Sequence, residues 1–240
     1  FYDRLAAVFC VSNYVRDIFL GSPPFVDPEK VKITYPVISL NKFGLPDNRA
    51  KELRLKWGMA DNDFVIGFVG RITVEKGLDD LIGAAALLKD KGVLFKLVFV
   101  GQVNPDTPEY LEHLKDLTRL NGLGEYVVFE GFTTQVNAVM QAVDCLVIPS
   151  VIPETFGLAL CEAAACGKPV IASNTGAQGE IVQDGVSGFI VPPGQPEKLA
   201  KALYKLVSDP QAAQIMGECG RRYVAEQFAS EQIIVEVENH

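Results

Sequence analysis

The sequence predicts an α/β fold with a doubly wound parallel sheet, on the basis of three observations. Short apolar, β-branched or aromatic runs alternate along the chain with segments of helical pattern. The runs are apolar throughout, which is typical of parallel strands covered on both faces. Hydrophobic residues make up 48% of the 240 residues, enough for a sizeable core. In such a sheet, ligands bind outside the carboxyl ends of the strands.

The elements are expected in the following order. The apolar runs predict strands at residues 6–11, 32–37, 64–70, 95–101, 126–131, 145–150, 169–173 and 188–191. Helical patterns lie at residues 48–57, 77–91, 108–122, 134–142, 157–166, 176–184, 196–207 and 210–228.

Residues 1–40 differ from the rest of the chain. They carry one strand and one helix (SNYVRDIFL), followed by the turn-rich stretch GSPPFVDPEK. Because one strand and one helix cannot bury a core, we expect 1–40 to be the end of a preceding domain and its linker, and the chain to be a fragment. The main domain is then 41–225, and 226–240 is a C-terminal tail helix that packs on the preceding domain.

Charge and cysteine content exclude several classes of protein. Thirty acidic residues against 22 basic ones give a net charge of −8, which argues against nucleic acid or an anionic membrane as partner. No apolar run approaches the length of a membrane span. The five cysteines show no C-x-x-C spacing, which favours buried free thiols in the cytoplasm over zinc or disulfides. His113 lies in a polar helix and is interpreted as a solvated residue, which leaves little for a Ser/His or Cys/His hydrolase.

The stretch GRITVEKG follows a predicted strand and precedes a predicted helix. Gly70 permits a sharp turn at the end of the strand, and Arg71 and Lys76 then lie on either side of the loop. A guanidinium, an ammonium and a helix N-terminus together form an anion site. The alternative is that both cations are surface residues paired with nearby acids, namely Glu75, Asp79 and Asp80.

The stretch PETFGLALCEAAACGKPVI places two glutamates at the next such strand end. Glu154 is expected in the loop, and Glu162 a little over one turn into the following helix, projecting back toward its start. Gly157 lies where the chain enters that helix, so the N–H groups of Phe156, Gly157 and Leu158 can approach a ligand closely.

A carboxylate within so apolar a helix needs hydrogen-bond donors. Burial without partners costs several kcal/mol or shifts the pKa until the group is neutral. A sugar or ribose diol supplies two O–H donors to one carboxylate. Cations for phosphate and carboxylates for hydroxyls together describe a nucleotide-sugar. The alternatives are a favourable interaction of Glu162 with its helix dipole and a solvated loop position for Glu154.

The segment Asp61-Asn62-Asp63 has the D-x-D form of a metal–nucleotide motif. It lies before the strand at 64–70, at its amino end and away from the predicted ligand crevice. A turn is therefore the preferred interpretation.

These stretches resemble the donor-binding domain of retaining family 4 glycosyltransferases of the GT-B fold. GRITVEKG resembles their G-R-x4-K-G segment, and ETFGLALCE matches their E-x7-E motif. Further similar pieces, in the family's order and over nearly the whole chain, are VFCVSNYVRDIF, LVFVG, VVFEGF and GEIVQDGVSGFIVPPG. Two positions depart from the pattern: Gly101 is followed by Gln-Val where the family has x-G, and no proline precedes Glu180.

The resemblance implies a Rossmann-like C-terminal domain and a role for each candidate residue. Arg71 and Lys76 would bind the donor diphosphate and stabilise the leaving nucleotide, in place of a metal. Glu162 would hold the ribose diol, and Glu154 would face the donor sugar at the reacting centre. Arg71, Lys76 and Glu154 would thus be the catalytic residues.

The remaining donor contacts are also implied by the resemblance. Gly70, Gly101 and the N–H groups at 156–158 would approach the donor, and the base would lie against Phe132 and Thr133. The donor would be a UDP- or GDP-sugar, and no metal or other cofactor is expected. The acceptor stays open, since the missing N-terminal domain would bind it.

Three functions remain open. The chain is the donor half of a retaining hexosyltransferase, inactive in transfer as a fragment; a nucleotide-sugar binding module without transfer activity; or another Rossmann-like enzyme such as a nucleotide-sugar epimerase. No G-x-G-x-x-G follows a strand, which disfavours a dehydrogenase-type site.

Overall fold

Six parallel strands form the central sheet of the structure, a computed structural model that describes residues 5–23, 26–60 and 63–229. Their spatial order is β5-β4-β3-β6-β7-β8, so the direction of winding reverses between β3 and β6. The strands are β3 (Val65–Val69), β4 (Lys96–Val100), β5 (Val127–Gly131), β6 (Cys145–Ile148), β7 (Val170–Ser173) and β8 (Gly188–Val191). The predicted doubly wound parallel sheet is confirmed.

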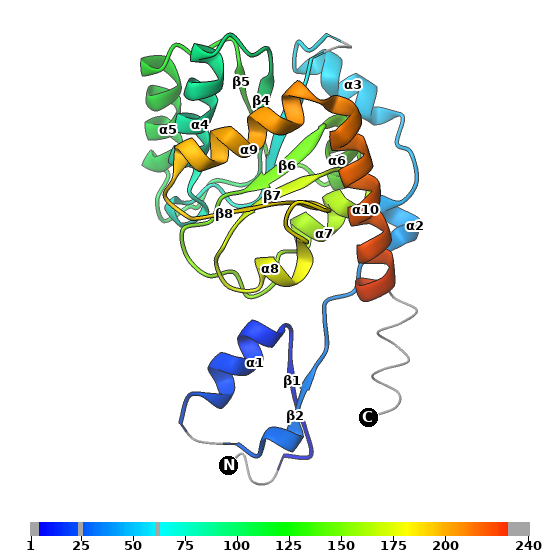
Figure 1. Ribbon diagram of the computed structural model, residues 1–240. Helices are drawn as coiled ribbons and strands as arrows, with labels where there is room; N and C mark the ends of the chain where they lie inside the picture. The colour runs from blue at the N-terminus through cyan, green and yellow to red at the C-terminus, as the bar shows by residue number, and fades with distance from the viewer. Residues whose placement is uncertain (1–4, 24–25, 61–62, 230–240) are drawn as a thin grey trace.

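Helices cover both faces of this sheet (Figure 1). One layer contains α4 (Leu78–Asp90), α5 (Glu109–Leu120) and α9 (Pro196–Ser208). The other contains α3 (Arg49–Lys56), α6 (Val136–Ala142), α7 (Leu158–Ala165) and α10 (Pro210–Phe228). Each of these helices lies where the sequence predicts one, to within two residues at either end.

Alternate side chains of the strands pack against the two helical layers. Ile66 and Phe68 of β3 point into the larger core cluster, whereas Val65 packs with Trp57 and Val143 on the opposite face. All of these strand residues are fully buried. Because both faces are covered, neither face needs polar side chains, which is why the strands are apolar throughout.

Residues 5–23 and 26–33 form a small unit with its own apolar cluster, drawn in blue below the main sheet in Figure 1, whereas Tyr35 and Ile38 already pack against the core of the main domain. Strands β1 (Val8–Cys10) and β2 (Val31–Ile33) pair in parallel, with α1 (Asn13–Leu20) between them. A small apolar cluster lies under this pair, formed by Cys10, Val26 and Val31. The division of the chain at residue 40 remains a prediction.

Several details differ from expectation. The strand expected to residue 37 pairs only through Ile33, shortly before Pro36, which has no N–H to donate. Helix α8 (Gln178–Ile181) is shorter than the predicted 176–184, with the left-handed residues Gly176 and Gly185 on its two sides. A short helix α2 (Leu40–Phe43) was not predicted.

Some predictions fall partly outside the described residues. The tail at 226–240 is described only to residue 229, and Asp61 and Asn62 of the D-x-D segment are not described. Of the five cysteines, all free, Cys166 and Cys219 are partly exposed rather than buried.

Gly101 lets the ends of β3 and β4 meet. Its φ is +154°, and a Cβ there would lie 1.7 Å from the carbonyl oxygen of Gly70. The Gly70 N–H donates to Val100 O at 3.0 Å, and the Gly101 N–H donates to Gly131 O at 2.9 Å. A side chain at position 101 would therefore separate the loops that follow these strands.

We expect Gly101→Ala to lower the free energy of unfolding by at least about 2 kcal/mol, because the new methyl group collides with backbone. Gly124→Ala is the matched control, since nothing lies within 4 Å of its added Cβ; its effect should stay within about 0.5 kcal/mol. Chemical denaturation measures both, and an equal effect of the two variants would contradict the packing role of Gly101.

Candidate functional site

The loops after β3 and β6 are packed together at the carboxyl edge of the sheet. A 3-10 turn at Val74–Lys76 leads into Gly77, which has a left-handed φ of 65°. A Cβ on Gly77 would lie 2.2 Å from the carbonyl oxygen of Pro149. The Val151 N–H donates to Glu75 O at 2.9 Å. The two predicted site loops are therefore fixed against each other.

An ion pair between Lys76 and Glu154 spans these loops. Lys76 Nζ lies 2.5 Å from Glu154 Oε1, and each side chain is 20% exposed. The same carboxylate oxygen accepts a hydrogen bond from the Ser150 hydroxyl, which is fully buried at the end of β6. Lys76 and Glu154 were expected to contact different parts of a ligand, whereas in this structure they pair with each other. It did not identify Ser150, whose signal was a lone hydroxyl at a strand end.

Arg71 is exposed and forms no ion pair with a described residue. Asp79, one of the acids considered as a surface partner of Arg71, instead accepts a hydrogen bond from the Tyr110 hydroxyl and contacts His113. The pKa of Glu75 is lowered mainly by hydrogen bonds from its own N–H and from Thr73, and less by the charge of Arg71. The guanidinium is therefore free to bind an anion.

Three adjoining cavities lie along this edge, and they share residues of the two loops. The central cavity, about 370 Å³, is lined by Gly70, Lys76, Glu154 and residues 155–159, and on its other side by Val11 and Pro36. The cation cavity, about 310 Å³, is lined by Arg71, Lys76, Glu154 and Asn104. The Phe132 cavity, about 210 Å³, is lined by Gly70, Arg71, Gly101, Gln102, Phe132 and Thr133.

All but one of the candidate residues line one of these cavities. Gly70, Arg71 and Lys76 are each shared by two of them, and Glu154 lines both the central and the cation cavity. The exception is Glu162, which lines none. The structure thus brings together both cations and one of the two acids, with the second acid further along α7.

Helix α7 begins at the central cavity without a side-chain cap. Its N-cap residue is Gly157, with φ 140°, and Leu158 and Ala159 of its first turn line the cavity. Phe156 is buried beside it and anchors the loop in the core. The first turn of α7 therefore lies at the cavity with N–H groups that no side chain caps.

Glu162 is a half-buried acid of α7 for which the structure gives no hydrogen bond to a described residue. Burial raises the pKa of its carboxyl group, and the charge of Lys42 on α2 partly offsets this. The buried neighbours on the same helix include Cys161, Ala163 and Ala165. Partial burial of this carboxyl group makes its charged form less favourable in the folded protein.

Residues 101–104, where the sequence departs from the family pattern, continue the parallel pairing of β3 and β4 beyond the ends of these strands. The Ile72 N–H donates to Gln102 O at 2.9 Å, and the Asn104 N–H donates to Ile72 O at 3.3 Å. These bonds hold residues 101–104 beside the loop that carries Arg71. Gln102 and Asn104 thereby reach the Phe132 and cation cavities, which the sequence alone did not indicate.

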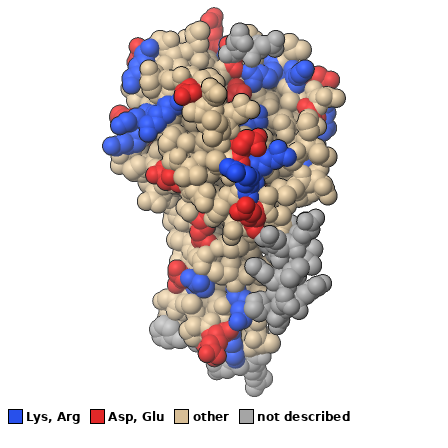
Figure 2. Space-filling view, turned by 45° about the vertical axis from the view of Figure 1, so that its right-hand side comes forward, with Lys and Arg blue, Asp and Glu red and all other residues tan. Residues whose placement is uncertain are grey.

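Charge elsewhere on the molecule is mixed. Figure 2 shows basic and acidic side chains in small interspersed groups, separated by uncharged surface. None of the described helices has the length and apolar character needed to cross a membrane. Within the described ranges, no cluster of His, Cys, Asp or Glu has the arrangement of a metal site. His113 is exposed, as expected, and stacks on Tyr110.

The parallel sheet, its switch point and the cavities at its carboxyl edge define a Rossmann-like domain of the kind that forms the C-terminal half of GT-B glycosyltransferases. The chain belongs to the family described as glycosyl transferases group 1, which matches residues 50–223.

Relatives of known name are identical to this chain at about a third of the aligned positions. D-inositol 3-phosphate glycosyltransferase of Streptomyces bingchenggensis is 34% identical over 208 residues, which are 84% of this chain and 45% of that protein. Alpha-maltose-1-phosphate synthase of Mycolicibacterium smegmatis is 31% identical over 234 residues, 93% of this chain and 59% of that protein. The chain thus spans about half the length of these relatives.

Solved structures show the same fold. Anabaena Alr3699/HepE in complex with UDP matches with a TM-score of 0.92 at 26% identity, over 99% of this chain and 64% of that chain. The C-terminal domain of the group 1 glycosyl transferase LpcC from Francisella tularensis matches with a TM-score of 0.71 at 27% identity, over 80% of this chain and 99% of that one.

The raised pKa of Glu162 predicts a pH-dependent effect of Glu162→Gln. A raised folded-state pKa means that this residue's contribution to stability is fully present below its unfolded pKa and is lost as pH rises through the folded value. Replacing it with the neutral amide should therefore raise the melting temperature at pH 7, and the gain should disappear as the pH falls below the unfolded pKa of glutamate.

Thermal unfolding between pH 3.5 and pH 8, roughly spanning the ordinary pKa of glutamate, measures this difference. Glu125→Gln, at an exposed turn position, should show no such trend. Loss of folding in Glu162→Gln would contradict the account and make Glu162 a structural residue.

Proposed function

We propose that this chain is the donor-binding domain of a retaining family 4 glycosyltransferase, which transfers a hexose from a UDP- or GDP-sugar to an acceptor. The observation that carries the proposal is that Arg71, Lys76 and Glu154 line one cavity at the carboxyl edge of the sheet. Anabaena HepE, which matches over 98% of this chain, has also been solved with UDP-glucose.

In this proposal the two cations bind the donor diphosphate. A guanidinium can fork onto two phosphate oxygens, and an ammonium supplies a point charge. Because the leaving diphosphate gains negative charge in the transition state, cations already in place stabilise it more there than in the ground state. The uncapped start of α7 at Gly157 adds N–H groups with a positive dipole end.

The two acids would bind hydroxyl groups. Glu154 lines the same cavity as Lys76 and would face the donor sugar near the reacting centre. Glu162, without a hydrogen-bond partner among the described residues, would accept from the ribose diol. The base would lie in the Phe132 cavity, where the Phe132 ring is 70% exposed and Thr133 supplies a hydroxyl. An exposed aromatic ring at a cavity is suited to stacking.

A second candidate is a nucleotide-sugar binding module, because the chain spans about half the length of its relatives. Hydrolysis of UDP-glucose by the isolated chain would distinguish a transfer site from a binding site. Sugar interconversion without an acceptor would instead indicate an epimerase. A cytoplasmic location, expected from the free thiols, belongs to the same proposal.

We expect Arg71→Ala and Lys76→Ala each to weaken UDP binding about tenfold or more, since each removes a charged hydrogen-bond donor to the diphosphate. Lys201→Ala on the exposed face of α9 removes the same charge elsewhere and should leave the affinity unchanged. Calorimetric titration with UDP and with GDP measures these constants. Unchanged affinity in both site variants would refute the diphosphate site.

Removal of divalent metal should leave nucleotide binding unaltered, because Arg71 and Lys76 are proposed to neutralise the diphosphate themselves. Titration of UDP in EDTA, compared with titration in added Mg²⁺ or Mn²⁺, tests this directly. A large loss of affinity in EDTA would show that the diphosphate needs a metal ion.

A further inference from the structure

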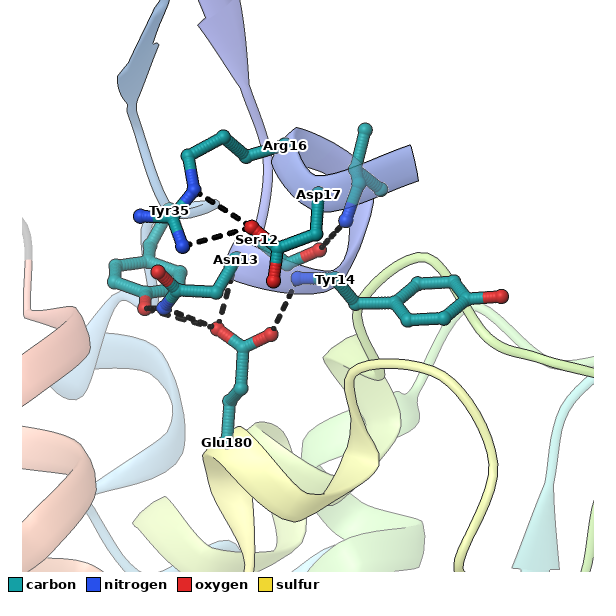
Figure 3. Close-up of polar contacts among 8 residues, drawn as sticks. Ser12, Asn13, Tyr14, Arg16, Asp17, Tyr35 and Glu180 are labelled. Carbon is teal, nitrogen blue, oxygen red and sulfur yellow. Dashed lines mark hydrogen bonds and ion pairs between the residues drawn. The ribbon is translucent and has the colours of Figure 1, made fainter. Parts of the chain in front are cut away.

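The side chain of Glu180 binds the N-terminus of helix α1, although Glu180 lies 167 positions from Asn13 in the sequence. The Glu180 carboxylate accepts from the N–H groups of Asn13 (3.0 Å) and Tyr14 (2.9 Å). It also accepts from Asn13 Nδ2 (2.8 Å) and from the Tyr35 hydroxyl (3.0 Å). Figure 3 shows these bonds converging on the two oxygens of one carboxylate.

Glu180 places a negative charge at the N-terminus of α1, where the helix has no acidic residue of its own. A negative charge is favourable at this end of a helix. Its N-cap, Ser12, accepts from Val15 N–H, so Glu180 serves the two N–H groups that the cap leaves over. Burial raises the pKa of Glu180, but hydrogen bonds from Tyr14 and Asn13 lower it by more, so the net pKa lies below the ordinary value.

A second hydrogen bond connects the N-cap of α1 directly to the loop that carries Glu154. The Ser12 hydroxyl donates to Thr155 O at 2.7 Å, between Glu154 and Phe156 in the chain. The backbone oxygen of Glu154 in turn accepts from Ala177 N–H at 2.9 Å, just before α8. Since α8 carries Glu180, the start of α1, the Glu154 loop and α8 form one closed hydrogen-bonded ring.

Two residues adjacent in sequence to the hydrogen-bonded residues Ser12 and Tyr35 line the central cavity. Val11 directly precedes the N-cap of α1, and Pro36 directly follows Tyr35. The Tyr35 ring also packs on Phe156, with centroids 5.9 Å apart. The anchoring of α1 and Tyr35 therefore fixes one wall of the cavity against the loop that carries Glu154.

We propose that Glu180 is a positioning residue, which holds the wall formed by Val11 and Pro36 over the central cavity and so preorganises the nucleotide-sugar site without touching the ligand. The inference rests on the proposed function for the identity of the ligand. The anchoring itself is a property of the free protein. A site whose wall is in place only part of the time binds with an affinity reduced by that fraction.

The test compares Glu180→Gln with Glu226→Gln in the 240-residue chain. The first replaces the acceptor carboxylate with an amide that offers only one oxygen to four donors; the second makes the same charge change at an exposed position of α10. Hydrogen exchange of the amides of α1 measures the anchoring, and calorimetry with UDP measures the site. If the wild type does not bind UDP, GDP is used as the probe.

In Glu180→Gln we expect amide exchange in α1 to accelerate about tenfold or more, and the Kd for UDP to rise about fivefold. Glu226→Gln should match the wild type in both. Tyr35→Phe keeps the ring and removes one of the four hydrogen bonds to Glu180, together with the bond that the hydroxyl accepts from Asn13 Nδ2. Because the carboxylate keeps its other three donors, this variant should change both quantities in the same direction by less. This milder variant also decides the question if Glu180→Gln does not fold.

Unchanged exchange in α1 would overturn the anchoring. Faster exchange with unchanged nucleotide affinity would overturn the link between the anchor and the site. If the wild type binds neither UDP nor GDP, the proposed function fails, whereas the exchange measurement still decides whether Glu180 anchors α1.

Discussion

The packing of the β3 loop against the β6 loop is the constraint on which the rest of the site depends. Parallel strands place their carboxyl ends at one edge, and β3 and β6 are neighbours at the switch point of the sheet. Gly77 allows the two loops to touch, because any Cβ there would meet the backbone of Pro149. Only with the loops in contact can Lys76 reach Glu154. A slight separation of these strands would divide the cations from the acid.

In the free protein, only some of the charged side chains of the candidate site are paired with each other. Lys76 and Glu154 form a partly buried ion pair. Within the described part of the chain, Arg71 forms no ion pair and the half-buried Glu162 forms no hydrogen bond. A diphosphate would compete with Glu154 for the ammonium, and a diol would supply the donors that Glu162 lacks. In the proposed function, binding would therefore exchange one internal ion pair for several contacts to the ligand. The same ion pair keeps Lys76 close to the position in which a phosphate would need it.

Elements and site loops could be predicted from the sequence because they depend on local pattern. The apolar runs ended within two residues of the ends of β3 and β6, so Arg71 and Glu154 were correctly placed at the carboxyl edge. The Lys76–Glu154 pair and the anchor at Glu180 could not be predicted, because both join segments far apart in the chain. The family resemblance included the segment that carries Glu180 but assigned this residue no role. Its role follows from the N–H groups of α1, which only the tertiary structure brings to it.

In the proposed function, Glu154 holds Lys76 until a diphosphate takes its place. The most direct measurement is the affinity of UDP, which carries no sugar, for Glu154→Gln compared with the wild type. The amide no longer holds the ammonium by charge, and one negative charge near the phosphates is gone. The account therefore predicts that Glu154→Gln binds UDP several-fold more tightly than the wild type at low salt, with a smaller gain at high salt. Equal or weaker binding of UDP by the variant would contradict it.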